Sequence, residues 1–209
     1  MKTKFSLLFS AILFTIAAVA QFEGKIEFNK ISGKDTSKYI YYVKGDNIRI
    51  DNLGAKGEVL GTSLVDLKDN SKYVAISPNR KMYMDVSPKK SIKDYSTTEL
   101  KKTNETKSLY GFTCTKWLAT NKDFGTTATY WMTEGFDFFS PMLHIVKRKE
   151  NLGQYLMTSE LIKGWCPLMS EERDRNGNLI EKIETISISK ETIADSMFTI
   201  PKGFQKFEN

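Results

Sequence analysis

The sequence contains few residues whose types and spacing match a known catalytic pattern. His144 is the only histidine, and catalysis by a serine or cysteine nucleophile needs a histidine or similar base beside it. His144 lies between Leu143 and Ile145 in a predicted helix, and no G-x-S-x-G motif accompanies it. Glu171 and Glu172 are adjacent acids in a predicted loop, where such pairs are ordinary surface residues. We therefore expect no catalytic residues; an enzyme would need clustered acids, or His144, in a cleft.

The only two cysteines are Cys114 and Cys166. A disulfide between them would close a loop of about 50 residues and add about 4 kcal/mol in the chain-entropy model. The alternative is two buried free thiols that pack as small apolar side chains. Both alternatives stay open, because the sequence gives no distance between the two Cα atoms. Two cysteines and one histidine cannot build a four-ligand zinc site without carboxylates, so we expect no metal.

Large apolar side chains are the most suggestive group in the composition. The chain has 3 Trp, 9 Tyr, 13 Phe and 8 Met residues. Such side chains suit a pocket for an acyl chain, because they are large, apolar and adaptable. The alternative is plain core packing. The candidates for lining a pocket are Phe28, Tyr41, Met82, Met84, Phe112, Trp131, Phe139, Met142 and Leu143.

The first twenty residues have the three parts of a cleaved secretory signal. Two lysines precede an apolar run over Phe5–Ile16, and Ala18-Val19-Ala20 then ends in small residues before Gln21. This pattern predicts cleavage after Ala20 and a periplasmic or secreted protein. The apolar run is shorter than the roughly 20 residues that span a bilayer. We expect residues 21–209 to form a single domain with no transmembrane span.

Charge and motifs exclude several classes of partner. The formal net charge of the whole chain is +6. Domains that bind nucleic acid show a stronger, more localised basic bias and a recognisable motif. The sequence also has no glycine-rich phosphate loop. We therefore expect no nucleic-acid partner and no cofactor.

Most of the chain after residue 21 has the pattern of short β-strands. Phe22, Gly24, Ile26 and Phe28 alternate with charged residues, which is typical of a strand with one wet face. Turn sequences such as Asn176-Gly177 separate the strands and predict hairpins, whose neighbours are antiparallel. The predicted strands cover 22–28, 39–43, 48–50, 64–67, 73–76, 82–86, 110–118, 126–132, 155–162 and 180–188, with Phe198 and Ile200 closing the set.

Residues 87–107 interrupt the strand pattern. They contain six lysines, and Ser96 with Glu99 predicts a cap for a short helix before Leu100. A solvated loop or an exposed helix is the favoured interpretation of this segment. The alternative is a docking patch for acidic head groups or an acidic partner.

A helix is predicted over residues 139–146. Ser140 can cap its free N–H groups, and Pro141 suits the first helical position. The basic residues 147–149 complement the negative end of the helix dipole, and residues 151–153 are expected to end the helix.

These elements predict a mainly β (α+β) fold of about ten antiparallel strands with one or two covering helices. The apolar stripe of the 139–146 helix is too narrow to cover such a sheet. The inner face must then be filled by its own side chains or stay open as a cleft.

Four motifs, in this order, resemble an exported bacterial family, the domain of unknown function numbered forty-four twelve. They are Phe22-Glu23-Gly24-Lys25-Ile26, the run from Tyr110 to Trp117, Tyr130-Trp131-Met132-Thr133, and the run from Phe198 to Phe204. That family is similar to the periplasmic lipoprotein carriers LolA and LolB. The resemblance implies an incurved antiparallel half-barrel whose helices cross the concave side and enclose an apolar cavity. It carries over no catalytic residues.

Two functions follow from these observations. The first is a non-enzymatic periplasmic binding protein for an apolar ligand, such as a lipid or a lipoprotein acyl chain. The second is a structural or interaction module of the cell envelope, with a core filled by side chains and a protein partner. An open apolar pocket would favour the first, and a packed interior the second.

Overall fold

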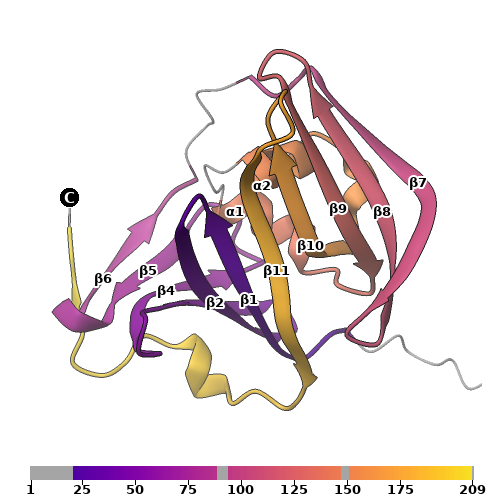
Figure 1. The fold of residues 1–209 in the computed structure, drawn as a ribbon. Helices are drawn as coiled ribbons and strands as arrows, with labels where there is room; N and C mark the ends of the chain where they lie inside the picture. Colours follow the sequence, from indigo (N-terminus) through magenta and orange to yellow (C-terminus); the bar gives the residue numbers. More distant parts are fainter. Residues whose placement is uncertain (1–20, 89–93, 147–150, 209) are drawn as a thin grey trace, which may run out of the picture.

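The computed structural model describes residues 21–88, 94–146 and 151–208. Within these residues, twelve strands form one open sheet that curls around two short helices (Figure 1). The sheet does not close into a barrel. The predicted mainly β architecture, an incurved sheet with one or two covering helices, is therefore confirmed, with twelve strands instead of about ten.

The order of strands across the sheet is β12-β6-β5-β4-β3-β2-β1-β11-β10-β9-β8-β7. Neighbours are antiparallel except for β12, which pairs parallel with β6. The strands are β1 (Gly24–Ser32), β2 (Asp35–Lys44), β3 (Asn47–Leu53), β4 (Val59–Asp66), β5 (Tyr73–Ser77), β6 (Met82–Val86), β7 (Thr98–Leu109), β8 (Phe112–Asn121), β9 (Thr126–Glu134), β10 (Trp165–Arg173), β11 (Leu179–Lys190) and β12 (Gln205–Lys206). The helices are α1 (Phe139–Val146) and α2 (Asn151–Met157), with 3₁₀ turns at Pro78–Arg80, Glu160–Ile162 and Asp195–Phe198.

The central strand β1 shows how alternation and a bulge shape the sheet. Ile26 and Phe28 are 4% and 6% exposed, whereas Glu27 between them is only partly buried. The pairing of β1 with β11 shifts by one residue between Glu27 and Phe28. The unpaired residue is Ile186 of β11, and such a bulge increases the local twist and bends the strand that carries it.

Both helices pack onto the concave side of the sheet (Figure 1). α1 has the predicted bounds and begins at Phe139, so Ser140 lies in its first turn instead of preceding it. The buried side chains of the helices are Phe139, Met142, Leu143 and Ile145 on α1 and Leu152, Gln154, Tyr155 and Leu156 on α2. The basic residues 147–149 lie outside the described residues.

The strand predicted at residues 155–162 is wrong, because α2 and a 3₁₀ turn occupy this segment. Leu152, Tyr155 and Leu156 recur at the spacing of one helical face, and each is at most 1% exposed. Residues 151–153 therefore begin a second helix and do not end the first one. Burial of the short segment under the sheet overrides the β-rich appearance of its sequence.

The prediction of a loop or helix at residues 87–107 is wrong for its second half. Residues Thr98–Leu109 form β7, an edge strand paired with β8, and Ser96 with Glu99 caps no helix. No residue of β7 is fully buried, so its sequence shows no clear apolar alternation, and charged side chains on an edge strand oppose edge-to-edge aggregation. The lysines of this segment therefore concealed a strand. Residues 89–93 lie outside the described residues.

After β11 the chain forms a C-terminal strap, residues 191–208, that crosses the ends of the N-terminal strands (Figure 1). Phe198 and Ile200 lie in this strap, not in the predicted final strand. The Arg49 Nη1 atom donates to the carbonyl of Met197 at 3.2 Å. The Gln205 amide donates to the carbonyl of Lys81 at 2.9 Å, next to the pairing of β12 with β6. The strap depends on these polar contacts and on a few apolar side chains.

Candidate functional site

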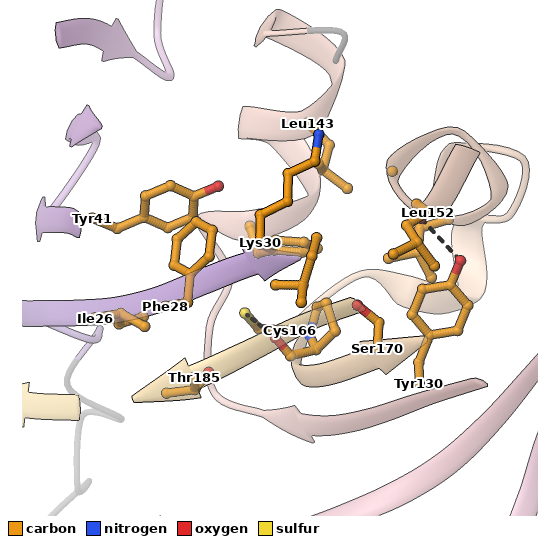
Figure 2. A pocket seen from close by; sticks show the side chains of 15 residues that line it. Ile26, Phe28, Lys30, Tyr41, Tyr130, Leu143, Leu152, Cys166, Ser170 and Thr185 are labelled. Atoms are coloured by element: carbon orange, nitrogen blue, oxygen red, sulfur yellow. Dashed lines mark hydrogen bonds between the residues drawn. The ribbon is translucent and has the colours of Figure 1, made fainter. Parts of the chain in front are cut away.

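An apolar cavity of about 60 Å³ lies between the concave face of the sheet and the two helices. Strands β1, β2, β9, β10 and β11 form its floor, and α1 and α2 form its roof (Figure 2). The residues that line it are Ile26, Phe28, Lys30, Tyr41, Tyr130, Phe139, Leu143, Leu152, Gly153, Leu156, Cys166, Pro167, Ser170, Ile183 and Thr185.

Strand register brings the floor residues together. Tyr41 of β2 lies opposite Ile26 of β1, and its ring meets the Phe28 ring edge-on at a centroid distance of 4.7 Å. The alternation of β1 therefore directs its apolar side chains to the same face as Tyr41. On β11, Thr185 lies opposite Phe28 and extends this face toward β10.

Two polar contacts tie the walls of the cavity to their neighbours. The Tyr130 hydroxyl donates to the carbonyl of Leu152 at 2.9 Å, which joins β9 to α2 (Figure 2). Burial raises the pKa of Tyr130 well above its usual value, so this hydroxyl stays protonated and keeps donating. At the other end, the hydroxyl of Tyr110, in the β7–β8 turn, donates to the carbonyl of Thr185.

The structure brings four of the nine candidate pocket residues to the cavity: Phe28, Tyr41, Phe139 and Leu143. Met142 is fully buried on α1 but packs into the core. The other four do not line the cavity. Met82 and Met84 lie on β6. The Phe112 ring packs against the Phe136 ring, with their centroids 5.4 Å apart. The Lys107 ammonium lies over the Trp131 ring, 4.1 Å from its centroid.

Sequence reasoning missed Lys30, the one charged residue among the described residues of the lining. Its Nζ atom lies 3.2 Å from Oε2 of Glu181, and the two side chains are 15% and 8% exposed. The Ser32 hydroxyl also donates to Glu181 Oε2, at 3.2 Å. A signal was available, because Lys30 continues the inward positions of Ile26 and Phe28 in the period-two pattern. A lysine at an inward position is uncommon unless it is paired.

The residues considered for catalysis are not assembled into a site. His144 is exposed on α1 and does not line the cavity. Glu171 and Glu172 lie in β10, not in the predicted loop. Glu172 is 2% exposed and accepts hydrogen bonds from Asn151 Nδ2 at 2.7 Å and from the Tyr155 hydroxyl at 3.1 Å. It therefore anchors α2 to the sheet.

The described residues contain no group of three or more His, Cys, Asp and Glu side chains that could hold a metal ion. None of the described helices is long and apolar enough to cross a membrane.

Cys114 and Cys166 are free thiols, 0% and 4% exposed. They lie on β8 and β10, which are separated by β9. Strands with one strand between them are roughly 10 Å apart, beyond the ~7 Å between Cα atoms that a disulfide spans without backbone movement. Of the two alternatives left open by the sequence, the structure contains the buried thiols.

We expect both thiols to resist labelling in the native protein. Burial raises the pKa of Cys114 and of Cys166 above the usual thiol value, so both stay protonated at about pH 8, where an ordinary thiol begins to ionise. A maleimide should label both cysteines only after denaturation, as mass spectrometry would report. Rapid labelling of the native protein would contradict the burial. Failure of the denatured, unreduced protein to react would reveal a disulfide.

Comparison with known proteins establishes the family. The profile of the family described as Domain of unknown function (DUF4412) matches residues 22–204. The chain belongs to this family, as its ordered motifs indicated. No curated protein matches the chain significantly.

Solved structures share the fold at low sequence identity. An uncharacterized conserved protein from Thermus thermophilus matches with a TM-score of 0.57 and 8% identity, over 90% of this chain and 91% of that one. PNGF-II matches with a TM-score of 0.50 and 18% identity, over 91% of this chain but only 31% of PNGF-II. These likenesses concern the fold alone.

A putative outer membrane lipoprotein-sorting protein domain from Vibrio parahaemolyticus also matches. It aligns over 87% of this chain and 90% of that one, at 10% identity and a TM-score of 0.33.

Proposed function

We propose that this chain is a non-enzymatic, exported binding protein for an apolar ligand, such as a lipid or a lipoprotein acyl chain. The observation that carries the proposal is the apolar cavity between the sheet and the two helices. Burial of apolar ligand surface there would drive binding at roughly 25 cal/mol per Å², before the costs of association.

The size of the cavity limits what it can enclose. A buried water needs about 10–15 Å³ of such volume, so the 60 Å³ present has room for a few heavy atoms. The end of an acyl chain fits this description, but a whole chain does not. Binding of a long chain then requires α1 and α2 to move outward from the sheet.

The competing function is an envelope interaction module without a ligand. One observation favours it: aromatic side chains pack much of the interior, with the Phe22 and Phe136 ring centroids 4.8 Å apart and Phe138 fully buried. Under this alternative the small cavity is a packing defect, and the functional surface lies elsewhere.

Native mass spectrometry of the protein purified from its own envelope distinguishes the two functions. We expect a bound lipid or acyl species, and we expect a fluorescent fatty acid to gain emission with the delipidated protein. N-terminal sequencing of the same material should start at Gln21 if the signal is cleaved as proposed. A ligand-free mass together with no response of the fluorescent probe would favour the interaction module.

A further inference from the structure

We propose that the cavity selects an amphiphile with a carboxylate head group, which the Lys30 ammonium binds while the apolar chain enters beneath α1 and α2. This inference rests on the proposed binding function and adds the chemical class of the head group. It is carried by the position of Lys30, the only charged side chain among the described residues of the lining.

Lys30 is the only charged residue among the fifteen described residues that line the cavity. Its place on β1 follows from strand alternation, since Ile26 and Phe28 precede it on the same face. Figure 2 shows its side chain rising from β1 with the amine toward Leu143 of α1. The cation therefore lies at the helix side of the cavity, beside the apolar wall that would hold a chain.

One partner of Lys30, the Glu181 carboxylate, is not among the lining residues. Glu181 contacts the ammonium at 3.2 Å. In the β1–β11 register it lies opposite Ser32, one inward position beyond Lys30. Lys30 therefore belongs to the lining of the cavity, whereas the Glu181 carboxylate does not. A ligand carboxylate would exchange for, or join, the present contacts of Lys30, since an ammonium has three donors.

Head groups of different charge should then bind with different strength. A carboxylate makes short, charge-assisted hydrogen bonds to an ammonium, which are roughly twice as strong as bonds between neutral groups. A methyl ester keeps the same apolar chain but offers only a neutral acceptor. An alkylammonium would bring a second cation close to Lys30 with no water between the two charges.

The test compares dodecanoate, methyl dodecanoate and dodecylammonium as competitors for N-phenyl-naphthylamine, an uncharged fluorescent probe, on the delipidated protein. We expect dodecanoate to bind about tenfold more tightly than the ester, and the ester more tightly than the ammonium. Equal affinity for acid and ester would overturn the head-group inference and leave the binding function standing. No displacement by any of the three would overturn both.

Variants assign the preference to Lys30. Lys30→Met alone removes the cation beside the buried Glu181 carboxylate and risks unfolding, so the main variant is Lys30→Met with Glu181→Gln. It should bind acid and ester equally and keep its affinity for the ester. Glu181→Gln alone should raise the preference for the acid, because Glu181 then no longer competes for the ammonium with a charged carboxylate. Lys182→Met is the control, since Lys182 pairs with Glu184 and does not line the cavity. A preference for the acid that survives in the double variant would contradict the proposal.

Discussion

Replacing Gly153 with leucine should abolish ligand binding and leave the protein folded. Gly153 lies in α2 and lines the cavity. Among the described residues, a Cβ added there would meet the Leu143 Cδ2 atom alone, at 3.9 Å, which is ordinary van der Waals contact. The remaining carbons of a leucine would extend into a cavity of only 60 Å³ and occupy the volume that an acyl end needs.

The fold should tolerate this change, because glycine within a helix costs about 0.5–1 kcal/mol relative to alanine. Gly153→Ala is the matched control, since it brings the same helix stabilisation with one carbon in place of four. We expect Gly153→Ala to retain fluorescent fatty-acid binding and to raise the melting temperature slightly. Gly153→Leu should lose at least about tenfold in affinity, because a ligand must displace a packed side chain. Unchanged binding by a folded Gly153→Leu variant would move the ligand site away from this cavity.

Replacing Asp51 with alanine should lower the free energy of unfolding by about 3–5 kcal/mol. The change leaves the Arg49 guanidinium, which has little access to water, without its carboxylate partner. Asp51 is 2% exposed. It accepts two hydrogen bonds from Arg49 Nε, at 2.9 and 3.0 Å, and one from the Thr62 hydroxyl at 2.6 Å. Arg49 also holds the strap through the carbonyl of Met197. This loss is a large share of the free energy of unfolding of a typical domain, which is roughly 5–15 kcal/mol.

Urea denaturation followed by circular dichroism measures this effect. Glu99→Ala removes an exposed ion pair, in which the Lys122 and Glu99 side chains are 79% and 74% exposed, and should leave the midpoint almost unchanged. A combined Arg49→Met and Asp51→Leu variant should recover part of the lost stability, since apolar residues can replace a buried pair. If Asp51→Ala and Glu99→Ala shift the midpoint equally, the buried pair of Arg49 and Asp51 does not stabilise the fold more than an exposed pair does.

Local sequence patterns predicted the strands with a regular apolar alternation and the helix with a clear N-terminal sequence. The inward and outward residues of β1 follow from a period of two, and α1 follows from Pro141 and the spacing of Phe139, Met142 and Leu143. The ordered family motifs predicted the curled sheet. These signals are local because they depend on which face of a single element meets the core.

Segments whose environment comes from distant residues were missed. β7 carries polar residues on both faces and is a strand only because β8 pairs with it along its length. α2 is seven residues long, too short to be stable as an isolated helix. It forms because Leu152, Tyr155 and Leu156 pack under the sheet and because Glu172 binds Asn151.

The sequence alone determined the class of fold and the family, and it predicted the export signal. These features depend on periodicity and on the order of short motifs. Only the tertiary structure decided which apolar residues surround the cavity, that Lys30 faces it, and that β9 separates the two cysteines. The physical reason is strand order. Alternation predicts the face of the sheet to which a side chain points, whereas the pairing of distant strands decides what it meets there.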